Sequence, residues 1–176
     1  MKRLGKFLLY LTVFLVLVLF FAPKRQLYYF GESKLAPYGV VLSGEYVDDG
    51  GLSLSLKDGT LYYQDLEVAK LPEVTVLPLL VFNAVTVAPF SFSEQMQGFV
   101  PGTVDGIRVR QSLLDPLHVL VDASGDFGTL EGNIDLGARR VSLLLMPSKR
   151  LLESKSFWLK ELKKQQSGGY LYESAF

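Results

Sequence analysis

Residues 129–145 read TLEGNIDLGARRVSLLL, an alternation of polar and apolar side chains that predicts a β-hairpin. Residues 137–140 mark its turn, and the alternation resumes at Val141. Both predicted strands then send apolar side chains to the same face, which we treat as a candidate apolar groove: Leu130, Ile134, Leu136, Val141, Leu143 and Leu145. One wet face and one apolar face are typical of an antiparallel sheet.

The same period of two recurs upstream of this hairpin. Residues 52–56 alternate leucine with serine, Lys57-Asp58-Gly59 predicts a turn, and residues 61–69 predict the returning strand. The apolar run 74–80 contains Pro78, which favours an edge strand or a bend. We expect further strands at 81–87, 90–93, 107–110, 117–121 and 169–173, and turns at 48–51 and 122–126. No long helix alternates with these strands before Pro147, which argues against a parallel α/β sheet.

The N-terminal segment predicts a membrane anchor. Phe7 to Ala22 is uncharged, and a helix from Leu4 to Pro23 would span about 30 Å, the thickness of a hydrocarbon core. A cleaved signal peptide is the alternative, but the bulky Phe20 and Phe21 stand where cleavage needs small residues. The predicted anchor is built on Phe7, Leu8, Leu9, Val13, Leu15, Val16, Leu17, Phe20 and Phe21.

Charge is distributed unevenly along the 176 residues, although the 18 basic and 18 acidic side chains balance. Residues 1–25 carry five basic groups and no acid, residues 26–138 have a net charge of −10, and residues 139–176 have +5. The acidic middle excludes a nucleic-acid partner, which needs a basic face. A small basic excess before the anchor and the long body after it place the body across the membrane. In a bacterium this means the inner membrane with the bulk in the periplasm; a body in the cytoplasm is the alternative.

After Ser148 the period changes to three and four residues, which predicts an amphipathic helix over 148–166 with Ser148 as its N-cap. One face is basic. The apolar stripe either packs on the sheet or binds an anionic membrane or a partner protein. Its residues are Leu151, Leu152, Trp158, Leu159 and Leu162.

Catalytic chemistry is not indicated. The chain has no cysteine and a single histidine, His118, which falls on one face of a predicted strand. It also lacks a glycine-rich phosphate loop and a serine-nucleophile motif. We therefore expect no enzyme, no metal and no cofactor. The expected organisation is an anchor at 1–25, a juxtamembrane linker at 26–37, the sheet at 38–147, and a helix with a tail at 148–176.

Two stretches resemble a known family. Residues 52–66 with 77–82, and residues 128–136 with 140–145, resemble the strand repeats of general secretion pathway protein N and its AsmA-like relatives. The resemblance implies one inner-membrane helix and a periplasmic β-sheet folded into a groove. It also implies a role in type II protein secretion or, among the AsmA-like relatives, in lipid traffic. It implies no catalytic residue.

Two functions therefore compete, each with partners in the bacterial envelope. The first is a structural, non-enzymatic component of a secretion assembly. The second is a periplasmic groove that shields lipid acyl chains, an arrangement also used by lipopolysaccharide bridge proteins. The helix 148–166 distinguishes them, because lipid has no room if that helix covers the candidate groove. An envelope enzyme with an unrecognised site is a third, weaker alternative.

Overall fold

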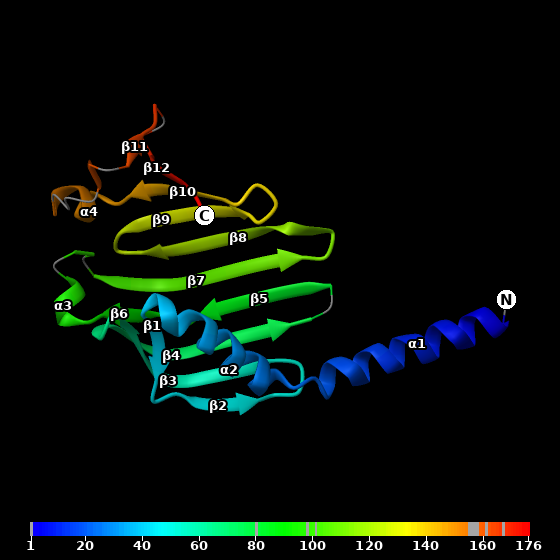
Figure 1. Ribbon diagram of the computed structural model, residues 1–176. Helices are drawn as coiled ribbons and strands as arrows, with labels where there is room; N and C mark the ends of the chain where they lie inside the picture. The colour runs from blue at the N-terminus through cyan, green and yellow to red at the C-terminus, as the bar shows by residue number, and fades with distance from the viewer. Residues whose placement is uncertain are drawn as a thin grey trace.

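A large antiparallel sheet forms the body of the protein (Figure 1). The computed structural model describes residues 2–79, 81–97, 99–100, 102–154, 159–160, 162–166 and 168–176. Within these residues twelve strands form one sheet, in the order β1-β3-β4-β5-β7-β8-β9-β10-β12-β11. Two short strands complete it, since β2 continues the edge beside β3 and β6 lies between β4 and β7. The predicted mainly β, antiparallel architecture is confirmed.

The strands follow one another as a meander. Their bounds are β1 Val40–Ser43, β2 Tyr46–Asp49, β3 Leu54–Tyr63, β4 Leu66–Pro78, β5 Phe82–Val87, β6 Phe90–Phe92, β7 Thr103–Ser112, β8 Asp115–Gly125, β9 Gly128–Asp135, β10 Arg140–Pro147, β11 Lys163–Lys164 and β12 Tyr170–Ala175. The helices are α1 Lys2–Phe20, α2 Lys24–Leu35, the short 3₁₀ helix η1 Ala36–Tyr38, α3 Glu94–Gln97 and α4 Lys149–Glu153.

The predicted turn at Lys57-Asp58-Gly59 is wrong. These residues lie inside β3, where Lys57 pairs with Glu73 and Gly59 pairs with Leu71. Asp58 takes a positive φ of 58° within the strand. The hairpin turns instead at Gln64 and Asp65, whose φ angles of 48° and 65° match a type I′ turn. Both sites offer a residue that tolerates positive φ, and only the pairing of the flanking strands decides between them.

Pro78 does not make its strand an edge. β4 pairs with β3 on one side and with β5 and β6 on the other, so it is internal to the sheet. Pro78 is tolerated because it is the last residue of the strand. Strands β7 and β8 are longer than predicted, and Asp122 to Gly125 belong to β8 rather than to a turn. Asp48 and Asp49 likewise lie in β2.

The continuous helix expected over 148–166 is also wrong. Helix α4 ends at Glu153, and Lys163 and Lys164 already form β11. The predicted N-cap is confirmed, because the Ser148 hydroxyl accepts a hydrogen bond from the Leu151 amide at 3.1 Å. Leu151 and Leu159 are buried against Leu145, whereas Leu152 is exposed. Trp158 lies outside the described residues.

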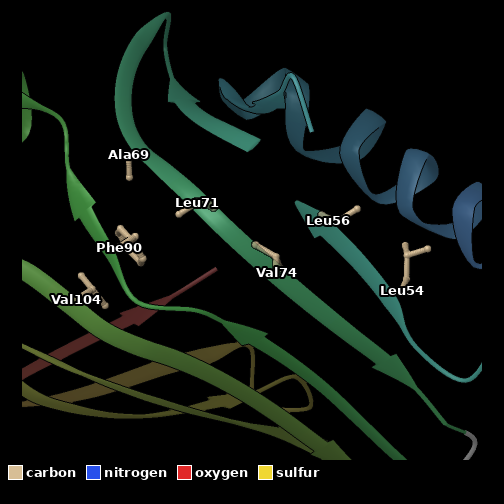
Figure 2. Close-up of a cluster of buried hydrophobic side chains, with 7 residues drawn as sticks. All are labelled: Leu54, Leu56, Ala69, Leu71, Val74, Phe90 and Val104. Carbon is tan, nitrogen blue, oxygen red and sulfur yellow. The ribbon is translucent and has the colours of Figure 1, made fainter. Parts of the chain in front are cut away.

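The first hydrophobic core joins the sheet to α2. Its buried members are Leu54, Leu56, Ala69, Leu71, Val74, Phe90 and Val104, drawn in Figure 2. Tyr28 of α2 packs against this cluster, and its hydroxyl donates a hydrogen bond to Glu45 Oε1 at 2.7 Å. Burial, together with Glu45, raises the pKa of Tyr28 far above its usual range. Residues expected to form a juxtamembrane linker thus contribute to the core.

The C-terminal end of helix α1 contacts the β2–β3 turn of the sheet. Helix α1 carries an 18-residue stretch, Arg3–Phe20, that is long and apolar enough to cross a membrane and is not buried by the rest of the chain. The Phe20 ring lies so close to Gly51 that a Cβ there would be 2.4 Å from it. Lys24 is only 2% exposed and pairs with Asp49 at 3.6 Å. Its ammonium also donates to the carbonyls of Phe20 and Ala22, which compensates for burying the charge.

We expect the Leu54→Ala variant to lower the free energy of unfolding of the body by about 2–5 kcal/mol, because it opens a cavity at a side chain only 2% exposed. The matched control Leu66→Ala removes an exposed side chain and should change it by no more than about 0.5 kcal/mol. Urea unfolding of the detergent-solubilised chain, followed by circular dichroism, measures both. Equal losses for the two variants would contradict the assigned core.

Candidate functional site

The strand register places a continuous row of apolar residues across the sheet. Starting from β2 and ending at β12, the directly paired residues are Val47, Leu56, Val74, Val87, Ile107, Ala123, Leu130, Leu145 and Tyr170. A second row runs parallel to it from β3: Leu54, Val76, Val85, Val109, Val121, Gly132, Leu143 and Tyr172. Since side chains two residues apart share a face, both rows lie on one side of the sheet.

The opposite face is polar over most of its width. The residues between the two apolar rows are Asp48, Ser55, Thr75, Thr86, Arg108, Asp122 and Glu131, and the row ends in Leu144 and Leu171. On this face Arg110 forms an ion pair with Asp122, and both side chains are partly exposed. A solvated face opposite an apolar one means that whatever covers the sheet must lie on the apolar side.

Described residues outside the strands pack on the apolar face at two places. Helix α2 packs at the β2–β4 end through Tyr28. Leu151, Leu159 and Leu162 pack on Leu145 at the other end. Between them Val85, Val109 and Val121 stay half-buried.

A cavity of about 460 Å³, which we call the apolar groove, lies on this face beside the place where Leu162 packs near Leu145. Its described lining is entirely hydrophobic or aromatic: Phe92, Val100, Val104, Ile107, Ala123, Phe127, Leu130, Leu143, Leu145, Leu162, Tyr170 and Tyr172. Three of the six residues chosen from the sequence therefore line it. Ile134 and Val141 pair with each other one row further along the same face, and Leu136 lies in the exposed β9–β10 turn.

Most of the lining could not be found from local pattern. Phe92 and Ile107 come from β6 and β7, far from the 129–145 hairpin in sequence, and only the pairing of β6, β7, β8 and β9 brings them beside it. The one available signal was the apolar alternation in each of those strands. Alternation predicts which residues of a strand share a face, but not which residues of other strands lie beside them.

Gly132 deepens the floor of the apolar face. It stands between Val121 and Leu143, and a Cβ at this position would approach Leu143 Cδ2 to 2.6 Å and Val121 Cβ to 3.1 Å. The glycine thus lets the neighbouring side chains lie over the strand backbone. A larger residue would push them toward the open side of the sheet.

A polar clamp holds α4 at the end of the groove. Asp126 Oδ2 accepts hydrogen bonds from the Thr103 amide at 2.9 Å and from Arg150 Nη1 at 2.8 Å. The Ser148 hydroxyl also donates to the Asp126 carbonyl oxygen. The Thr103 amide, with Arg150 beside it, lowers the pKa of Asp126 below its usual value, so the clamp stays charged at neutral pH.

His118 lies away from the groove, between two carboxylates near the opposite end of the strands. Its Nδ1 is 2.7 Å from Asp115 Oδ1 and its Nε2 is 3.6 Å from Asp135 Oδ2. The bond to Asp115 raises the pKa of the imidazole above its usual value. The carboxylates lie at opposite nitrogens of the ring, and within the described ranges no three such side chains converge on a point that could hold a metal ion.

No protein-family model, curated protein or solved structure matches the chain. The resemblance to general secretion pathway protein N thus stays a prediction.

Replacing Asp115 with Asn should lower the pKa of His118 toward its ordinary value, because the neutral amide no longer favours the imidazolium. In the folded chain the raised pKa gives stability that is fully present below the ordinary value of about 6.5 and is lost as pH rises through the raised value. NMR titration measures the pKa without ambiguity, since His118 is the only histidine. An unchanged pKa in D115N, with Asp65→Asn as the remote control, would contradict this assignment.

Proposed function

We propose that this protein is a membrane-anchored, non-enzymatic lipid-handling module that shields acyl chains on the apolar face of its sheet. The carrying observation is the apolar groove, whose described lining is entirely hydrophobic or aromatic. Its volume of about 460 Å³ falls within the range of sites that enclose small ligands. Hydrocarbon is the occupant favoured by such a lining, because a polar ligand would lose its hydrogen bonds to water without replacement.

The apolar face also offers a path beyond the groove. The half-buried valines of β4, β5, β7 and β8, namely Val76, Val85, Val109 and Val121, form one row across the strands that reaches the groove residue Leu143 through Gly132. An acyl chain lying on this face can therefore extend across the sheet beyond the groove itself.

Retention of α1 as an anchor is part of this proposal. A signal sequence would pass the same test of length and apolarity. The contact of Phe20 with Gly51 and the buried pair of Lys24 with Asp49 make the end of α1 a structural part of the body, which favours retention. We further propose that α1 lies in a bacterial inner membrane with the body in the periplasm, as the basic N-terminal flank favours.

A second candidate is a structural component of a secretion assembly of the type II kind, and one feature of the sheet edge favours it. On the side of β12 away from β10, only Tyr170 and Leu171 pair with another described strand, β11. The rest of β12, Tyr172 to Ala175, thus has an open edge as far as the described residues go. An open edge can accept a strand from another protein.

Leu143 and Leu144 provide a matched test of lipid binding, because these neighbours on β10 point to opposite faces of the sheet. Leu143→Gln places an unpaired amide in the groove and should strongly reduce the lipid that copurifies with the detergent-extracted protein. Leu144→Gln should leave it unchanged. Native mass spectrometry measures the bound lipid, and circular dichroism checks that both variants are folded. Wild-type protein carrying a stoichiometric protein subunit and no lipid would favour the secretion component instead.

The proposed topology is tested with a cysteine, since the chain contains none. Gln95→Cys lies in the exposed helix α3 and should react with a membrane-impermeant maleimide in intact spheroplasts. Lys2→Cys, on the other side of the proposed span, should react only after the cells are lysed. The reverse pattern would place the body in the cytoplasm.

A further inference from the structure

The end of the sheet nearest α1, which we call the anchor end, collects the turns of four separate hairpins. The contact of Phe20 with Gly51 fixes the β2–β3 turn at this end. Antiparallel pairing of Pro78 with Asn83, Phe82 with Ser112, and Asp135 with Arg140 then places the β4–β5, β7–β8 and β9–β10 turns there as well. Figure 1 shows α1 leaving the body beyond this same end.

Each of these turns carries exposed apolar side chains. We call the set the apolar rim: Leu52, Val81, Leu113, Leu114, Leu117, Leu136 and the C-terminal Phe176, all exposed. Leu114 is 97% exposed, and it occupies a turn tip where a polar or flexible residue would cost less. Single exposed leucines need no explanation, but seven such side chains at one end of a sheet mark an interaction surface.

Backbone hydrogen bonds link neighbouring parts of the rim in pairs. The Leu113 amide donates to the Val81 carbonyl at 3.0 Å, and the Leu136 amide donates to the Leu117 carbonyl at 2.8 Å. The Phe176 amide donates to the carbonyl of Arg139 at 3.0 Å. Six strand spacings of about 4.8 Å separate β3 from β10, so the rim extends over about 30 Å.

The turns at the opposite end differ in their tip residues. They carry the pair Gln64–Asp65 and Asp126, and the intervening helix α3 begins at Glu94. Exposed apolar side chains occur there too, and Tyr63 and Leu66 flank the polar Gln64–Asp65 tip, while Met146 and Leu152 lie near the end of β10 and in α4. At the anchor end the arrangement is inverted, and the exposed Arg139 and Arg140 stand beside Leu136.

We propose that the apolar rim lies in the interfacial region of the bilayer that α1 spans, so that the sheet stands on the membrane by its anchor end. Leucine and valine tips would bury their side chains at the level of the upper acyl chains, while Arg139 and Arg140 meet anionic headgroups. A rim about 30 Å wide also sets the orientation of the sheet, which one helix cannot do by itself. This inference rests on α1 being retained as an anchor, as proposed above, and does not require lipid in the groove.

Four single-cysteine variants of the full chain test the proposal: Thr12→Cys in α1, Leu114→Cys and Ala138→Cys in two anchor-end turns, and Gln95→Cys in α3. Each carries an environment-sensitive fluorophore and is reconstituted in vesicles of phosphatidylcholine and phosphatidylglycerol, with or without nitroxide-labelled acyl chains. The ten-residue strand β7 spans about 33 Å, so the two ends of the sheet are well resolved by quenching. Ala138→Cys leaves the whole rim native, which controls for the label at position 114.

We expect blue-shifted emission and nitroxide quenching at positions 12, 114 and 138, and neither effect at position 95. If the label at position 12 is quenched but the labels at 114 and 138 are not, as at 95, the proposal that the rim lies in the bilayer is wrong. The anchor assignment would then still stand. An unquenched label at position 12 would overturn both. Lipid bound in the groove is measured separately through Leu143→Gln, so its failure is distinguishable from failure of the rim.

Discussion

The in-register pairing of apolar residues across the strands is the constraint on which the rest of the structure depends. A shift of one residue in any pair would move its apolar side chains to the solvated face, so each hairpin must keep the register of its neighbour. The pairs Val87 with Ile107 and Ala123 with Leu130 extend this constraint from the packed core to the uncovered centre of the sheet. The same alternation thus supplies the apolar side chains of the first core and those that line the groove.

Two groups of residues outside the central strands pack on the apolar face. Tyr28 of α2 packs on the first core, and Leu151, Leu159 and Leu162 pack with Leu145 and Leu130. Because α4 ends at Glu153 instead of continuing to residue 166, the described chain does not place the expected long helix on this face. The cover at Leu145 therefore comes from a short helix and the residues after it.

The junction between α1 and the body links the proposed function to its place in the cell. Lys24 is buried with Asp49 as its partner, and Phe20 rests on a glycine that no other residue could replace without a clash. A helix joined to its domain by a flexible linker would leave the orientation of the sheet undefined. Here the β2–β3 turn lies against the C-terminal end of α1, so under the proposed anchoring this end of the sheet lies nearest the membrane.

The sequence by itself determined the strand-rich class, the apolar N-terminal helix and the hairpin of residues 128–147, because those features depend on local period and length. The candidate residues Leu130, Leu143 and Leu145 were found in this way, as was the Ser148 cap. Tertiary structure alone decided that Lys57-Asp58-Gly59 continues a strand, that Pro78 ends an internal one, and that α2 belongs to the core. Turn residues such as Asp58 and Asp65 tolerate the same backbone angles, so the choice between them falls to pairing with distant strands. The groove also depends on pairing between distant strands, because Ile107 of β7 and Leu143 of β10 line it together only when the register from β7 to β10 is fixed.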